Sequence, residues 1–243
     1  MVPAELAEDG TNSYGRDNTF GGYSDRIVVS ADFVLKIPAG LAPEVAAPIL
    51  CAGATTYSPM KRWGVRAGDK VGIIGMGGLG HLAAKIARVL GAEVTIFTTT
   101  DEKLAEAAKL GFTAVLEKDT AALKSLKTSF DFILSTVPEK HDINPFVKLL
   151  KRDCALVVVG ALEPLAPINN QEVAFHRRSV SGSLIGNLTD TQEILDLCAE
   201  HGIGPEIEII PISEINAAFK KVENGDVRFH YVIDILSLTE TDA

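Results

Sequence analysis

The stretch "GIIGMGGLGHLAAK", residues 72–85, places five glycines in an otherwise apolar run. Residues 75–80 match the pattern GxGxxG, directly after the run "KVGII" and at the start of an amphipathic helical pattern. In a strand–turn–helix of this kind, free N–H groups and the positive end of the helix dipole face a bound diphosphate. We assign Gly75 to the tight turn, Gly77 to the approach of the phosphates and Gly80 to helix–strand packing. The alternative is a glycine-rich turn that binds no ligand.

Buried β-branched runs alternate with amphipathic segments from this motif onward. Such alternation is typical of a parallel sheet with helices on both faces, because right-handed crossovers place the helices there. We therefore predict an α/β fold with a doubly wound parallel sheet of the Rossmann type. The strands are expected at 70–74, 93–97, 114–116, 130–134, 155–159 and 180–184, and the helices at 79–90, 101–110, 120–126 and 145–150.

Shorter apolar segments flank this region on both sides. The runs "RIVV" and "FVLKIP", between residues 23 and 38, resemble strands but have too few neighbours for a sheet of their own, so we assign them to a small lobe. The expected division is 1–40 as part of that lobe, 41–186 as the nucleotide-binding domain, and 187–243 as a helix and a return to the lobe. In the last part we expect helices at 191–201 and 213–223 and strands at 207–210 and 229–235.

Composition narrows the classes of function. The formal charge of −9, with no basic stripe, argues against binding to nucleic acid. No apolar run approaches the roughly 20 residues of a membrane-spanning helix, and the first ten residues lack the pattern of a signal peptide. We therefore expect no membrane partner and a cytoplasmic location. The cysteines Cys51, Cys154 and Cys198 are too dispersed for a disulfide framework or a self-contained zinc cluster.

The end of the second expected strand predicts the type of dinucleotide. An acid there would favour NAD by accepting hydrogen bonds from the ribose 2′-hydroxyl. This chain has Thr98, Thr99 and Thr100 instead, followed by Asp101 and Lys103. Hydroxyls and a lysine suit a 2′-phosphate, so NADP(H) is favoured. The alternative is that Thr100 or Asp101 only caps the next helix and that Lys103 is a solvated charge.

The other polar residues give weaker signals. His81, at the entrance of the helix, fits a place beside phosphates and a structural role equally well. The cluster at 176–178, His-Arg-Arg, is interpreted as a solvated edge. No Ser/His/Asp or paired-carboxylate arrangement supports a hydrolase, and His141, His201 and His230 show no spacing typical of metal ligands.

Several ordered motifs together resemble one family. The segments "FGGYSDRIVV", "AAPILCAGATTYSP", "GMGGLGHLAAK", "GSLIG", "TQEILDLCAEH" and "DVRFHYVID" are similar to the zinc-dependent medium-chain alcohol dehydrogenases, in the branch of the cinnamyl-alcohol-dehydrogenase type. The resemblance runs from about residue 20 to residue 235. It implies a Rossmann domain set between two pieces of a GroES-like catalytic lobe. It also implies hydride transfer between NADP(H) and a primary alcohol or aldehyde, with a zinc ion polarising the substrate oxygen.

The resemblance also assigns residues. Cys51 matches a zinc ligand of the family, and Thr55 would lie near the nicotinamide half of the cofactor, so both are candidate catalytic residues. Arg228 would approach the phosphates. The candidate cofactor-binding residues are Gly75, Gly77, Gly78, Leu79, Gly80, Thr98, Thr99, Lys103, Thr136, Val159, Gly160, Ser183, Ile185 and Arg228.

One feature departs from the family pattern. Family members carry the other zinc ligands ahead of the "GGYS" segment, and none of these ligands occurs here. A single cysteine cannot hold a catalytic zinc, so we predict no zinc in this chain alone and impaired activity. The alternatives are a non-catalytic NADP(H)-binding module and a zinc-free reductase. Because apolar strands would lack their lobe, we also expect a homo-oligomer, such as a dimer joined near residues 180–184.

Overall fold

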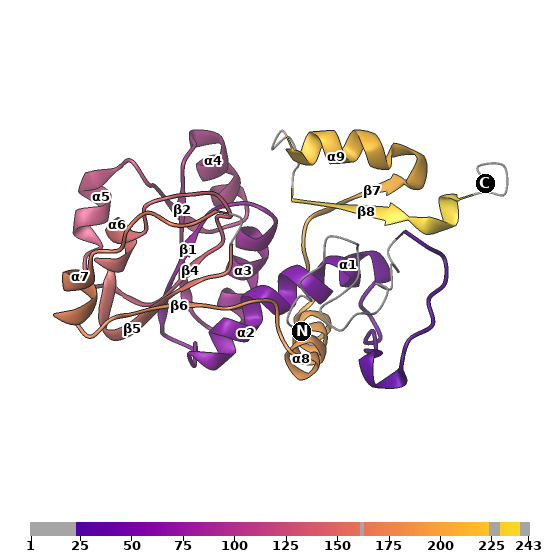
Figure 1. Cartoon of the computed structure of the whole chain (residues 1–243), viewed down its shortest axis with the longest axis horizontal. Coiled ribbons are helices and arrows are strands. Elements are labelled where there is room, and N and C mark those ends of the chain that lie inside the picture. Colours follow the sequence, from indigo (N-terminus) through magenta and orange to yellow (C-terminus); the bar gives the residue numbers. More distant parts are fainter. Residues whose placement is uncertain (1–22, 161–162, 224–228, 239–243) are drawn as a thin grey trace, which may run out of the picture.

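Six parallel strands form the central sheet of the computed structural model, which describes residues 23–160, 163–223 and 229–238 (Figure 1). The strand order is β3-β2-β1-β4-β5-β6, and every neighbouring pair is parallel. The predicted doubly wound α/β fold is therefore confirmed. The strands are β1 (Lys70–Ile74), β2 (Glu93–Thr98), β3 (Thr113–Leu116), β4 (Phe130–Ser135), β5 (Leu150–Val158) and β6 (Ser179–Gly182).

Helices connect these strands. The Asp119 side chain caps α5 by accepting hydrogen bonds from two backbone N–H groups of its first turn, and Asn169 caps α7 by accepting from Gln171. The helix α7 was not predicted from the sequence, since none of its residues is buried and it shows no apolar period. The helices of this part are α3 (Gly78–Val89), α4 (Asp101–Lys109), α5 (Thr120–Ser125), α6 (Asn144–Val147) and α7 (Asn170–Ala174).

Apolar residues fill both faces of the sheet. Side chains alternate along a strand, so neighbouring residues of β1 serve opposite faces. Ile73 packs with Leu82 of α3 in one cluster, whereas Ile74 packs with Phe146 of α6 in the other. The sheet is thus covered by helices on both sides, which is why its strands read as continuous apolar runs.

A helical segment leads into the sheet and packs against a later helix. It consists of α1 (Pro43–Pro48), a π-helical turn (Ile49–Gly53) and α2 (Ala54–Arg62), and it contacts α8 (Leu188–His201). Ile49 and Met60 are buried with Ile194, Leu195 and Cys198 in the same cluster that contains α3. The expected boundary at residue 186 therefore separates elements with a common core, and the three-part division stays a prediction.

A second, two-stranded sheet stands apart from the first (Figure 1). Its strands β7 (Ile207–Pro211) and β8 (His230–Asp234) are parallel and are joined through α9 (Ile215–Glu223). Helix α1 contacts both strands. Among the residues that the structure describes, none of the helices is long and apolar enough to cross a membrane.

The strands expected between residues 23 and 38 do not form. Only a 3-10 turn, Ala31–Phe33, is present in this stretch, and Val28 is fully exposed. The prediction rested on β propensity, but a strand is stable only when its N–H and C=O groups pair with a neighbour. Neither sheet of the described chain offers this stretch such a partner.

Candidate functional site

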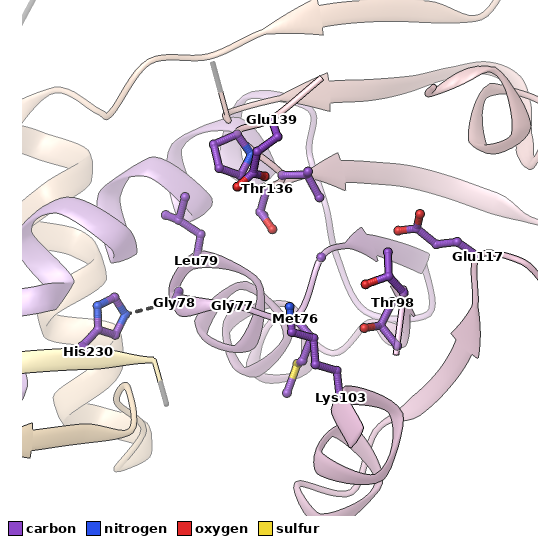
Figure 2. A pocket seen from close by; sticks show the side chains of 14 residues that line it. Met76, Gly77, Gly78, Leu79, Thr98, Lys103, Glu117, Thr136, Glu139 and His230 are labelled. Atoms are coloured by element: carbon purple, nitrogen blue, oxygen red, sulfur yellow. Dashed lines mark hydrogen bonds between the residues drawn. The ribbon is translucent and has the colours of Figure 1, made fainter. Parts of the chain in front are cut away.

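A cleft of about 510 Å³ lies where the carboxyl ends of four neighbouring strands meet (Figure 2). This is the place where open parallel sheets bind ligands. The glycine motif, the loops after β2, β3 and β4, and one residue of β8 form its walls. The lining residues are Gly75, Met76, Gly77, Gly78, Leu79, Thr98, Thr99, Lys103, Glu117, Thr136, Val137, Pro138, Glu139 and His230.

The glycine motif forms a close-packed turn with an open side. Gly75 has a φ of +96°, a conformation that favours glycine, and its N–H donates to the carbonyl of Phe97 at 2.9 Å. A Cβ on Gly80 would lie 2.0 Å from the Gly75 oxygen, so only glycine lets α3 approach the turn. A Cβ on Gly77 would meet nothing within 4 Å. The backbone at Gly77 is therefore open toward the cleft.

A buried hydroxyl without a partner marks the end of β2. Thr98 is 2% exposed, and its Oγ1 has no hydrogen-bond partner within the described residues. Buried polar atoms are nearly always paired, so this hydroxyl is available to hydrogen-bond a ligand. Thr99 and Lys103 line the same part of the cleft. Thr100 caps α4, since its Oγ1 accepts a hydrogen bond from the Lys103 N–H at 3.3 Å.

Thr136 lines the cleft, but its hydroxyl is already engaged. Both its backbone N–H and its Oγ1 donate to the carbonyl of Ile74, at 3.0 and 2.8 Å. The side chain therefore fastens the end of β4 to the end of β1, which carries the glycine motif. Thr136 therefore forms part of the cleft wall, while the hydrogen of its hydroxyl is already bonded within the chain.

Five described candidate cofactor residues lie outside the lining of the cleft: Gly80, which packs α3 against the turn, and four residues that follow β5 and β6. The N–H groups of Val159 and Ser183 donate to the carbonyls of Ser135 and Val158, extending the sheet ladder beyond β5 and β6. The other two are Gly160, where a Cβ would lie 2.3 Å from the Val137 oxygen, and Ile185, which has a φ of +52°.

The two candidate catalytic residues also lie outside the lining of the cleft. Cys51 is exposed on the π-helical turn, and Thr55 is buried on α2. Among the described residues, no group of three or more His, Cys, Asp or Glu side chains could hold a metal ion. The described residues thus do not fit a zinc site. Arg228 lies outside the described residues.

Three polar residues of the cleft were missed from the sequence: Glu117, Glu139 and His230. Glu117 directly follows β3, and its N–H donates to the carbonyl of Thr98 at 2.9 Å; burial raises the pKa of its carboxyl. His230 begins β8, and its Nε2 donates to the carbonyl of Gly78 at 3.0 Å. The position of Glu117 after an expected strand was an available signal, whereas nothing in the sequence pattern connected His230 with the glycine motif.

His81 is a structural residue. Its ring is fully buried, and its Nδ1 donates to the carbonyl of Gly77 at 3.0 Å while its Nε2 accepts from the N–H of Glu206 at 3.1 Å. The ring also stacks on Phe229 at a centroid distance of 4.0 Å. Burial lowers the pKa of His81 to about 4. Of the two roles that the sequence left open, the structure shows the structural one.

Known proteins resemble the chain over most of its length. Residues 78–200, slightly more than half of the chain, match the family described as zinc-binding dehydrogenase. An NADP-dependent alcohol dehydrogenase C 1 from Mycolicibacterium smegmatis is 44% identical over 230 residues, which cover 93% of this chain and 66% of that protein.

Solved structures show the same relationship. A cinnamyl alcohol dehydrogenase from Sorghum bicolor matches with a TM-score of 0.86 and 37% identity, over 93% of this chain and 65% of that one. The structure of CAD from Helicobacter pylori complexed with NADP(H) matches with a TM-score of 0.79 and 38% identity, over 89% of this chain and 62% of that one. The chain spans 65% and 66% of the length of two curated relatives that it matches. By its sequence and its fold, the chain belongs to the zinc-binding dehydrogenase family.

Proposed function

We propose that this chain binds NADP(H) and serves hydride transfer between the nicotinamide and a primary alcohol or aldehyde. The observation that carries the proposal is the combination, in one cleft, of the open backbone at Gly77 and the unpartnered buried hydroxyl of Thr98 beside Lys103. The names of the relatives, an NADP-dependent alcohol dehydrogenase and a cinnamyl alcohol dehydrogenase, support the proposal.

The chain's own residues would hold the two charged parts of NADP(H). The N-terminus of α3, at Gly78 and Leu79, presents backbone N–H groups and a positive dipole end to the diphosphate. Thr98, Thr99 and Lys103 offer hydroxyls and a cation to the 2′-phosphate. When bound, the cofactor supplies or accepts the hydride, while these residues bind and orient it.

Two histidines fix the direction of the N–H groups in the motif. A peptide unit is planar, so holding its carbonyl also sets the direction of its N–H. His81 holds the carbonyl of Gly77, which orients the N–H of Gly78, and His230 holds the carbonyl of Gly78, which orients the N–H of Leu79. The N–H groups proposed to bind the diphosphate are therefore oriented by contacts within the chain.

Fluorescence titration with NADPH and NADH tests the proposal. We expect Lys103→Met to weaken NADPH binding roughly 10- to 50-fold, because a charge-assisted contact to the 2′-phosphate is lost, and to leave NADH binding within about twofold. Lys109→Met, near the end of the same helix, is the matched control and should change neither affinity. Wild-type protein that binds neither nucleotide, or that prefers NADH, would overturn the proposal.

The second candidate is a non-catalytic NADP(H)-binding module. The position of Cys51 and Thr55, outside the lining of the cleft, favours it. An assay with NADPH and an aromatic aldehyde separates the two candidates. Consumption of NADPH that depends on both protein and aldehyde supports the dehydrogenase, and tight NADPH binding without turnover supports the module.

The proposal extends to assembly and location. The apolar groove of about 290 Å³ on β7, α9 and β8, which we call the C-terminal apolar face, is lined by Ile210, Ile215, Phe219, Val222 and Ile233 among others. Such a face promotes association, so we propose a homo-oligomer; elution as a monomer at micromolar concentration would contradict it. A reducing compartment such as the cytoplasm suits the three free cysteines, and cell fractionation tests this location.

A further inference from the structure

The proposed function leaves the acid at the end of β3, Glu117, without a task. Glu117 is fixed beside Thr98 by the hydrogen bond from its N–H to the Thr98 carbonyl. Figure 2 shows its carboxylate pointing into the cleft from the end of β3. Within the described residues, no hydrogen bond or ion pair reaches this carboxylate. The acid is therefore available to a ligand at the edge of the cleft next to the proposed 2′-phosphate site.

An apolar wall completes this part of the cleft. Val137 and Pro138, in the loop after β4, line it together with Glu139. His141 holds the loop in place, because its Nδ1 donates to the carbonyl of Glu139 at 2.8 Å and its Nε2 accepts from the hydroxyl of buried Ser135 at 3.0 Å. A fixed apolar wall with an acceptor nearby suits a flat heteroaromatic ring that carries a hydrogen-bond donor.

The order of the strand ends places the base of the dinucleotide in this part. If the diphosphate lies at the glycine motif and the 2′-phosphate at Thr98 and Lys103, the adenine is attached to the ribose at Thr98. The β1 side of Thr98 is then taken by the diphosphate. The base is left with the space bounded by Glu117 on β3 and by the loop that carries Val137 and Pro138.

We propose that the carboxylate of Glu117 accepts a hydrogen bond from the exocyclic amino group of the adenine and so selects the base of the cofactor. This inference rests on the proposed NADP(H) binding. An ionised carboxylate is only an acceptor, and the adenine amino group is a donor, whereas hypoxanthine has a carbonyl oxygen at the same place. Burial raises the pKa of Glu117, and its charged or titratable neighbours His141 and Lys103 act in the opposite direction. A carboxylate that is partly desolvated gains more from a donor than a fully hydrated one does.

Titration with NADPH and with its hypoxanthine analogue, reduced nicotinamide hypoxanthine dinucleotide phosphate, tests the proposal without requiring turnover. We expect wild-type protein to bind NADPH about tenfold more tightly than the analogue, because the analogue sets an oxygen against the carboxylate. Glu117→Leu should reduce this preference to less than about twofold. Glu117→Gln, whose amide oxygen still accepts, should keep part of the preference.

Glu139→Leu is the matched control, since it removes another carboxylate of the same cleft and should keep the wild-type preference. Equal affinity of wild-type protein for the two nucleotides would overturn the proposal, and this measurement needs no variant. A preference that survives in Glu117→Leu would also overturn it, as would tighter NADPH binding by that variant, which would mean that Glu117 opposes the 2′-phosphate. If wild-type protein binds neither nucleotide, the proposed function itself fails; if it binds NADPH without regard to the base, only the role of Glu117 fails.

Discussion

The two sheets of the molecule differ in how far their apolar side chains are covered. In the six-stranded sheet, Ile73, Ile74 and Leu134 are fully buried, whereas Ile209 of β7 is 54% exposed and Val222 of α9 is 55% exposed. The first sheet has helices on both faces, and the described chain supplies no such cover for the C-terminal apolar face (Figure 1). The stability of this chain therefore comes mainly from the six-stranded sheet and the helices packed on it.

Polar contacts connect the two regions at α3. Lys85 donates to the carbonyl of Gly204 at 2.8 Å and to the Glu206 carboxylate at 2.7 Å, and His81 reaches the N–H of Glu206. His230 of β8 holds the carbonyl of Gly78. The weakly covered sheet is thus fastened to the glycine motif, and its first strand position, His230, is part of the cleft.

The strongest test of close packing in the six-stranded sheet and its helices is Gly80→Ala. The added Cβ would lie 2.0 Å from the Gly75 oxygen, which is backbone and cannot move aside cheaply, so we expect a loss of more than about 3 kcal/mol in the free energy of unfolding. Urea denaturation measures it. Gly77→Ala is the control: its Cβ meets no protein atom, so the fold should persist while NADPH binding weakens. Wild-type stability in Gly80→Ala would contradict the packing argument.

A pair of truncations compares the two sheets directly. Leu134→Ala in β4 should lower the free energy of unfolding by about 3 kcal/mol, because it leaves a cavity in a filled core. Ile209→Ala in β7 should lower it by less than about 1 kcal/mol, since the side chain is already half in water. Midpoints of urea unfolding at equal m-values provide the measurement. Equal losses in the free energy of unfolding would mean that side chains of the two sheets contribute equally to stability, contrary to the prediction.

The same contrast explains how much of the fold the sequence predicts. The expected strand 70–74 has the bounds of β1, because its apolar pattern and its parallel partners lie within the chain. The strand expected at 155–159 instead starts at Leu150. The first half of β5 is polar and pairs irregularly with β4, so the apolar pattern alone does not show that the strand begins there. Residues 23–38 have the apolar pattern of strands, but neither sheet of the described chain provides a strand for them to pair with.

For the site, sequence adjacency decides what can be predicted. The glycine motif and Thr98, Thr99 and Lys103 each follow a recognisable strand, and the structure places them in one cleft. Glu117 also follows an expected strand, but only the strand order shows that this strand ends at the same cleft, and His230 reaches the cleft through the docking of β8. The sequence also does not predict the environment of each side chain. Arg178 was interpreted as part of a solvated edge, but it is only 4% exposed. It donates to the carbonyl of Leu150 and forms an ion pair with Glu172 at 3.1 Å.

Acid should loosen the connection between the two regions. The pKa of His81 is about 4 in the folded protein and ordinarily 6.5, so the unfolded chain takes up the proton first. The contribution of neutral His81 is complete above pH 6.5 and falls as the pH decreases toward 4, with a loss of about 2 kcal/mol at pH 5. The main physical reason is that burial of the ring disfavours its charged form, and a protonated Nε2 also could not accept from the N–H of Glu206.

Urea denaturation at pH 7.5 and at pH 5 checks this dependence. In His81→Gln, which has no titratable ring, the difference between the two pH values should shrink by about 2 kcal/mol. Burial also lowers the pKa of His230, so part of the dependence remains in the variant. His201→Gln, on an exposed position of α8, is the control and should keep the full difference. An unchanged difference in His81→Gln would contradict the assignment.

The smallest effect on stability is expected on the C-terminal apolar face itself. Val222→Ser should change the free energy of unfolding by less than about 0.5 kcal/mol, because the side chain is already 55% exposed. The same variant should lower self-association, measured by light scattering across a concentration series, since it interrupts the face. Phe175→Ser is the control, because Phe175 is 75% exposed beside the six-stranded sheet and lies outside this face. If Phe175→Ser lowers association and Val222→Ser does not, the copies meet beside the six-stranded sheet, and the C-terminal apolar face is not what brings them together.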